Sequence, residues 1–409
     1  MKTLTLTKDI SKNNFLSFLW HATFLALAQS FMDVDTIMPS MILEAGGNGV
    51  HVGILTAIAI SGSNFSQLIF VPYLNNKHFK KSFLLAGINI RALSLFGIAA
   101  LLYFSFALTG SSVIALIFLL ITLFSLSGAF ANISYTDIFG KSISPESRKS
   151  FLSIKQIIAG IGILFSAFLA RNILANFSYP VNYSIMFLLA ATVLGIASVG
   201  FWKIREVIAS GFSIKTLKAY KEAIKNEFLK NKRLKYYLGF INTVGISIVI
   251  LPFIILFAKE NFGTGNIETG NFLLAKIIGV VTAGMILTPI SKIIKYKFLM
   301  YFASLLALLI PFSLIITRSV PYFYFIFLIG GIIFSIYSVS MKGVLLEISD
   351  NTNRALYTGI AGAGSIIPIL FSLLGGWIIH QFGFTLFFSV FIIIILSSVY
   401  FIYKLNCMM

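Results

Sequence analysis

Four polar residues recur on one face of the first long apolar segment of the chain. They stand at i, i+4, i+7 and i+11, and they are Gln29, Asp33, Thr36 and Ser40. This spacing aligns them along one stripe of a continuous helix. A carboxylate in an apolar setting gains and loses a proton as its surroundings change, so Asp33 is the candidate for proton binding, with a structural hydrogen-bond acceptor as the alternative. Asp35 is rotated by about 200° on the same helix and is expected to face elsewhere.

Other polar side chains inside apolar segments are candidates for contacting a solute. Asn64, Gln67 and Asn132 carry neutral amides, which suit a polar solute. Lys276 could hold an anionic group or pair with Asp33. The alternatives are hydrogen bonding between helices for the amides and extension of the lysine towards the membrane interface.

Charged residues near the ends of apolar segments are expected to hold or gate the protein. Arg91 and Asp137 are each without an evident compensating charge near the same leaflet of the membrane, so we predict that they form a structural ion pair. Four basic residues are expected to gate or hold one side: Arg148, Lys155, Lys342 and Arg354.

These residues lie on or beside twelve apolar windows. The windows are 15–43, 51–74, 82–108, 113–138, 150–175, 181–202, 236–258, 269–290, 298–317, 322–346, 355–380 and 384–404. Each has at least the roughly 20 residues that a helix needs to cross a bilayer. The chain is 58% hydrophobic and only 11% charged. It is therefore predicted to be an all-α, multi-pass membrane protein.

Lysine and arginine collect in every second break between the windows, and the opposite breaks hold only Arg171, Lys259 and Arg318. Basic residues are retained on the cytoplasmic side, so both termini are predicted to be cytoplasmic, in the cell (inner) membrane. This rule accounts for the net charge of +18 without nucleic-acid binding.

The chain is organised as two sets of six spans. We predict one bundle at 1–202, a basic cytoplasmic linker at 203–235 and a second bundle at 236–409. The tetrapeptide ILFS occurs at 163–166 and again at 369–372, which relates the fifth and eleventh spans as repeats. Apolar residues spaced along the linker predict an amphipathic helix, at Ile214, Leu217, Ile224 and Phe228.

In this layout the chain resembles the major facilitator superfamily. The resemblance is carried by SPESRKSFLSIKQIIAGIG at 144–162 and by DNTNRALYTGIAGAGSIIPILFSLLGGWII at 350–379. The family's G-x-L-a-D-R-x-G-R-R-like stretch after the second span is reduced here to PYLNNKHFKK, and the G-P-x-x-G-G signature of antiporters is absent from the fifth span. The resemblance implies a twelve-helix fold and transport.

We therefore expect a secondary active transporter that works by alternating access, binds a small-molecule substrate together with H+, and acts as a monomer. Export of an amphiphile and a non-transporting sensor or assembly protein are the alternatives. No enzyme, cofactor or metal site is expected, because Gly140-Lys141-Ser142 lacks the upstream glycine of a phosphate-binding loop and the four histidines lack metal-ligand spacing.

Overall fold

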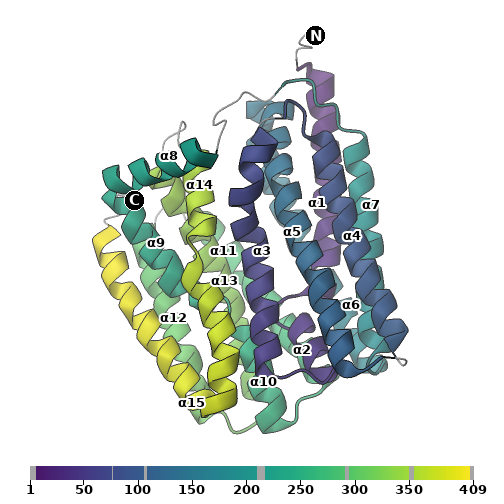
Figure 1. Ribbon diagram of the computed structural model, residues 1–409, viewed down its shortest axis with the longest axis vertical. Coiled ribbons are helices and arrows are strands. Elements are labelled where there is room, and N and C mark those ends of the chain that lie inside the picture. Colours follow the sequence, from purple (N-terminus) through teal and green to yellow (C-terminus); the bar gives the residue numbers. More distant parts are fainter. Residues whose placement is uncertain are drawn as a thin grey trace. The chain divides into compact units, whose positions relative to one another are not determined.

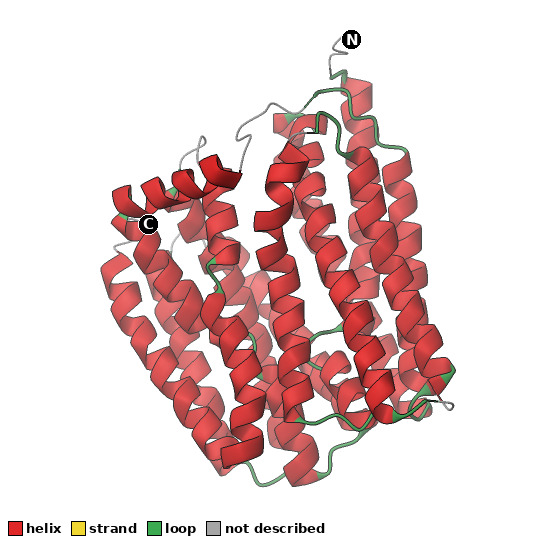
Figure 2. Cartoon of the chain, in the orientation of Figure 1, coloured by secondary structure: helices red, strands yellow, loops and turns green. Residues whose placement is uncertain are grey.

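The computed structural model describes residues 6–75, 77–105, 108–209, 217–290, 294–349 and 354–405. Every regular element in these ranges is a helix (Figure 2). Ten helical segments within them are long and apolar enough to cross a membrane. The last of these, Leu356–Leu405, covers two predicted spans, and the predicted span 51–74 corresponds to α3. The all-α fold with twelve spans is therefore confirmed.

The described part of the first six spans holds the following elements in chain order, and Figure 1 labels their α-helices. They are α1 (Lys8–Gln29), η1 (Ser30–Met32), α2 (Ile37–Glu44), α3 (Gly49–Asn75), α4 (Lys81–Tyr103), α5 (Gly110–Ser142), α6 (Pro145–Asn176) and α7 (Val181–Trp202).

The rest of the chain begins with a helix of the linker and continues through the last six spans. The elements are α8 (Leu217–Lys230), α9 (Lys232–Val244), η3 (Gly245–Ser247), α10 (Leu251–Phe262), α11 (Asn266–Ile290), α12 (Tyr296–Ile316), α13 (Pro321–Ile348), α14 (Arg354–Ala363) and α15 (Ile366–Leu405). Gly383, with φ 79° and ψ 178°, interrupts α15 between the two predicted spans that it contains.

The first span is a broken helix. α1 ends at Gln29, η1 adds one 3-10 turn, and Asp33 has extended backbone with φ −64° and ψ 124° before α2 begins. Pro39 explains the position of the break, because a proline has no N–H for the carbonyl four residues earlier and its ring clashes with that carbonyl, here that of Asp35. The predicted polar stripe needs one unbroken helix through Asp33, so that prediction is wrong.

The seventh span breaks in the same way. α9 ends at Val244, η3 follows, and α10 begins at Leu251 with Pro252 as its second residue. Pro252 leaves the carbonyl of Ile248 without its helical donor, as Pro39 does for Asp35 in the first span. The two sets of six spans therefore repeat a 3-10 turn and a proline at corresponding places.

A third break, in the eleventh span, is bridged by a side chain. Pro368 removes the donor for the carbonyl of Gly364, which lies between α14 and α15. Asn242 of α9 replaces that donor: its Nδ2 donates to the Gly364 carbonyl at 2.6 Å, and its Oδ1 accepts from the Ile367 N–H at 2.8 Å. One amide therefore satisfies both sides of the break.

The helices form two compact units. The described residues of Met1–Asp33 and Ser61–Lys221 make the first unit, and those of Val34–Ile60 and Glu222–Met409 make the second. The chain passes from one unit to the other at the break in the first span. The units therefore differ from the predicted halves chiefly by residues 34–60.

In the first unit, α4 packs against α5 and α7, and α1 packs against α6 and α7. Phe18 of α1 is fully buried and makes edge contacts with the rings of Tyr135 and Phe201, with centroids 4.9 and 5.3 Å away. At Gly162 of α6, a Cβ would lie 3.1 Å from the Cβ of Ala26. The small residue therefore permits the close approach of α6 to α1.

In the second unit, the linker helix α8 is docked on the protein. Ile224 and Phe228 pack against an apolar cluster that includes Tyr237 and Ile348. Tyr357 donates a hydrogen bond to Glu227 at 2.9 Å. Within the predicted linker, a helix covers Leu217–Lys230, while Ile214 lies outside the described residues.

Candidate functional site

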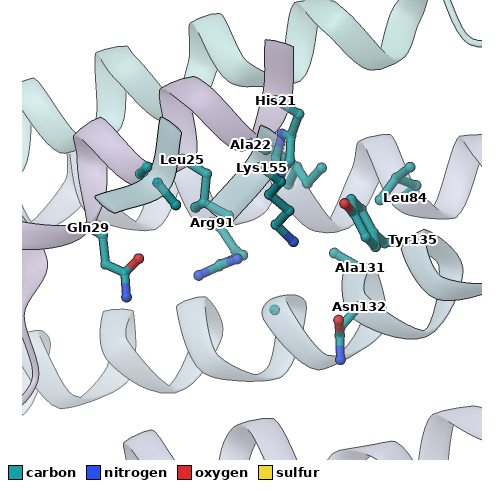
Figure 3. Close-up of a pocket in the computed structure, with 14 residues that line it drawn as sticks. His21, Ala22, Leu25, Gln29, Leu84, Arg91, Ala131, Asn132, Tyr135 and Lys155 are labelled. Carbon is teal, nitrogen blue, oxygen red and sulfur yellow. The ribbon is translucent and has the colours of Figure 1, made fainter. Parts of the chain in front are cut away.

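A cavity of about 280 Å³ lies within the first unit, among α1, α4, α5 and α6. Small and aliphatic side chains form most of its wall. The polar and aromatic residues that line it are His21, Gln29, Arg91, Asn132, Tyr135 and Lys155. Figure 3 shows the Arg91 and Lys155 side chains extending from different helices into the same space.

Arg91 enters the cavity from the middle of α4. Its Cζ lies 4.3 Å from the centre of the Phe124 ring, so the guanidinium is held by a cation–π contact. A Cβ on Gly128 would lie 3.3 Å from Arg91 Nε, so the glycine leaves room for the guanidinium. Arg91 Nε is buried and has no hydrogen-bond partner within the described part of the chain.

Lys155 and Tyr135 form a second polar group in the wall. Lys155 Nζ lies 5.6 Å from the centre of the Tyr135 ring. His21 is held nearby, with Nδ1 at 3.3 Å from the Ala197 carbonyl and its ring stacked on Phe201 at 4.2 Å. Nδ1 therefore carries a proton that it donates to the carbonyl.

The charged side chains in the cavity wall are all positive among the described residues. Arg91 and Lys155 are cationic, and none of the fourteen described residues that line the cavity is acidic. Gln29 and Asn132 add amide groups, each with donors and an acceptor. The wall can therefore bind a small polar group, and it favours negative charge.

The structure brings together some of the predicted site residues and separates others. Gln29 and Asn132 line the cavity as expected for solute contacts, and Lys155 lines it although a gating role was predicted. The side chains of Asn64 and Gln67 lie outside the described residues.

Sequence reasoning missed His21 and Tyr135. His21 stands eight residues before Gln29, on the same face of α1, and Tyr135 follows Asn132 by three, which also places them on one face. This spacing could have indicated that both residues line the same cavity as Gln29 and Asn132.

Lys276 pairs with Asp35. In the second unit, Lys276 Nζ of α11 lies 2.5 Å from Asp35 Oδ2, and their side chains are 7% and 15% exposed. The sequence predicts instead that Lys276 holds an anionic group or pairs with Asp33, and that Asp35 faces another side of the helix. The break in the first span explains the contact with Asp35, because extended backbone at Asp33 changes the direction of Asp35 relative to a continuous helix.

Two further polar contacts tie α2 to the last six spans. Lys259 of α10 forms an ion pair with Glu44 at 2.8 Å, and Ser40 Oγ lies 3.2 Å from Thr269 Oγ1 of α11. Thr36, which precedes α2, is fully buried. With the Asp35–Lys276 pair, these contacts hold α2 against α10 and α11 within the second unit.

The predicted Arg91–Asp137 pair is wrong. Asp137 instead contacts Lys80 at 3.0 Å and Lys141 at 2.8 Å. Lys141 also contacts Glu206 at 2.7 Å, and Glu206 accepts hydrogen bonds from the backbone N–H groups of Lys80 and Lys81 at 2.7 to 2.9 Å. Asp137 lies near the end of α5, where these lysines are within reach, whereas Arg91 lies in the middle of α4.

The remaining predicted gating residues are only partly described. Arg148 donates to the carbonyls of Ile143 and Gly140, so it satisfies backbone groups at the end of α5. Lys342 is exposed on α13, and the side chain of Arg354 lies outside the described residues.

A sequence model of the family described as Major Facilitator Superfamily matches residues 19–319 and again 236–406. A search of curated proteins gives no match. Among solved structures, a mutant of the nucleoside transporter NupG has a TM-score of 0.68 at 15% identity, and the match covers 96% of this chain and 98% of that one.

Two other solved structures are similar over almost their whole length. A POT family transporter in complex with a thioalcohol conjugated peptide has a TM-score of 0.69 at 13% identity, and the match covers 98% of this chain and 97% of that one. A bacterial homolog of the human lysosomal transporter Spinster has a TM-score of 0.62 at 13% identity, with coverage of 98% and 95%. At these identities the likeness shows the fold.

Proposed function

The chain belongs to the major facilitator superfamily, and we propose that it is a secondary active transporter whose substrate occupies the cavity among α1, α4, α5 and α6. The observation that carries this proposal is the cavity itself, in which polar side chains from four apolar helices meet. Polar and ionisable groups inside membrane segments are costly and usually mark solute pathways.

Transport of this kind requires the cavity to open to each side of the membrane in turn. The basic residues in alternate loops support an orientation in the cell membrane with both termini in the cytoplasm. In that orientation, α2, α10 and the start of α11 belong to the outer half of the protein. The Asp35–Lys276 and Glu44–Lys259 ion pairs would then separate and re-form as the outer side opens and closes.

The acidic residues at the break of the first span, Asp33 and Asp35, are the candidates for proton coupling. When Asp35 is ionised, its attraction to Lys276 favours the arrangement seen here. Protonation would neutralise the carboxylate and weaken that attraction, so proton binding would favour separation of the pair. Asp33, which is 9% exposed, stays a predicted coupling residue, but it no longer has the helical stripe as support.

The experiment uses purified protein in proteoliposomes loaded with a pH-sensitive dye. A panel of small metabolites is added outside, and solute-dependent proton entry is recorded beside solute counterflow, which needs no proton gradient. Asp35→Asn should abolish proton entry and leave counterflow measurable. Glu222→Gln, at an exposed position of α8, is the matched acid-to-amide control.

The outcomes separate the possibilities. Loss of proton entry only in Asp33→Asn would assign coupling to Asp33. Normal proton entry in both variants would reject coupling at this break. Failure of every panel solute to show either proton entry or counterflow with the wild-type protein would count against the transport function.

A further inference from the structure

We propose that the cavity selects a small organic anion and that Arg91 and Lys155 bind its carboxylate or phosphate oxygens. The inference rests on the proposed function in one respect: the cavity is taken as the substrate site. It deepens that function by naming the chemical class of the substrate.

The first support is the charge of the wall. Two cations point into a space of about 280 Å³, and the fourteen described lining residues include no carboxylate. An anion in the cavity would be attracted by both cations. A cationic solute would face two like charges and would be disfavoured.

The second support is the state of the Arg91 guanidinium. Its Nε is buried and has no hydrogen-bond partner among the described residues. Buried polar atoms in native proteins are nearly always paired, so an unpaired one calls for a missing partner. Guanidinium groups bind carboxylate and phosphate oxygens through two parallel N–H donors, and the Arg91 guanidinium extends into the cavity (Figure 3).

The third support is that the guanidinium is positioned by apolar neighbours. The Phe124 ring lies 4.3 Å from Cζ, and Gly128 leaves the space that the group fills. These contacts fix the side chain of Arg91 without satisfying its Nε donor. Structural basic residues of this unit donate to carboxylates or backbone carbonyls of the protein, as Lys80 and Arg148 do.

The size and the other polar groups limit the rest of the solute. A volume of about 280 Å³ is near the lower end of the roughly 300–1,000 Å³ of small-molecule sites. Gln29 and Asn132 provide amides for hydroxyl or carbonyl groups, and Tyr135 provides a ring. The expected substrate is therefore a compact metabolite with one or two negative charges.

The test measures binding and does not depend on transport. Purified protein in detergent is screened by thermal shift against small carboxylates, small phosphate esters and inorganic phosphate, each organic anion matched to a neutral counterpart, such as succinate with succinamide and glycerol phosphate with glycerol. Anions should raise the apparent melting temperature in a saturable manner, and their neutral counterparts should not. The carboxylate and phosphate arms distinguish the two sources of anionic oxygen.

Variants then assign the binding to the two cations. Arg91→Gln and Lys155→Gln should each weaken the affinity for the stabilising anion by about ten- to a hundredfold, the loss expected for a hydrogen bond to a charged group. Arg91→Lys should retain part of the affinity, because it keeps the charge. Arg171→Gln, on α6 with Lys155 but outside the cavity lining, should bind like wild type.

Equal stabilisation by anions and neutral counterparts, no stabilisation by any anion of the panel, or unchanged anion binding in Arg91→Gln would each overturn the proposal. The experiments distinguish failure of the transport proposal from failure of the anion-site proposal. Charge-dependent binding without any flux in proteoliposomes would reject transport and keep the anion site. Flux of a neutral solute that does not depend on Arg91 would reject the anion site and keep transport.

Discussion

Removing one partner of the Asp35–Lys276 pair should cost the folded state several kcal/mol. Asp35→Asn leaves Lys276 as a cation with a 7% exposed side chain and without the carboxylate that lies at 2.5 Å. At an effective dielectric constant of about 20, the attraction over that distance is about 6–7 kcal/mol before desolvation is counted. Removing one partner of a buried pair costs about 3–5 kcal/mol in practice, and we expect Asp35→Asn to fall in that range.

The companion variants complete a double-mutant cycle. Lys276→Gln leaves the carboxylate without its lysine and should cost a similar amount. The double variant Asp35→Asn with Lys276→Gln removes both charges, so it should recover about 2 kcal/mol or more relative to the sum of the single losses. Glu222→Gln, on exposed surface, should change stability by no more than about 0.5 kcal/mol.

The assay is the free energy of unfolding of the purified protein, from denaturant titration in mixed micelles followed by tyrosine and tryptophan fluorescence. Each variant is first checked by size-exclusion chromatography. Strictly additive losses, with no coupling between Asp35 and Lys276, would refute the argument that this contact stabilises the fold. A single loss below about 1 kcal/mol would show that the pair behaves like an exposed one.

Four further predictions follow from the fold. Arg91→Gln should leave the thermal stability of the ligand-free protein equal or higher, because it removes a buried donor that lacks a partner; a loss of several degrees would mean that Arg91 has a structural role. Asp137→Asn should cost about 1–3 kcal/mol, because buried Lys80 loses its carboxylate while Lys141 keeps Glu206, as read by unfolding titration, and a change near zero would contradict the network. Asn242→Ala should cost about 1–3 kcal/mol through the lost bridge, whereas stability equal to wild type would show that other groups satisfy the break. A cysteine-accessibility tag in 203–235 should react only from the cytoplasm and one in 259–268 only from outside; reaction of both from one side would reject the proposed topology.

The positions of the spans could be predicted because the bilayer requires a long apolar segment for each span, whatever the details of packing. The window 15–43 corresponds to Lys8–Glu44, and 181–202 corresponds to Val181–Trp202. The break in the first window could also have been predicted, because Pro39 removes the donor for a carbonyl one turn earlier. A long apolar run with a proline inside should be treated as two half-helices when residues are assigned to faces.

The roles of the charged residues could not be predicted from spacing alone. Arg91 was assigned to Asp137 because both lacked an evident counter-charge, but Lys80, which is distant in sequence and buried, reaches the carboxylate. Lys155 was assigned to gating from its place near a span end, yet it lines the cavity. Such assignments depend on which helices are neighbours, and helical periodicity within one span does not contain that information.

The membership of residues 34–60 in the second unit affects how the protein can be divided. Val52 of α3 belongs to the same apolar cluster as Phe253 of α10, and Lys259 contacts Glu44. A polypeptide that begins after the linker therefore lacks part of its own core. Cutting the gene at the linker leaves the second unit incomplete, and a short fragment ending near residue 60, supplied in trans, is the natural complement for the C-terminal piece.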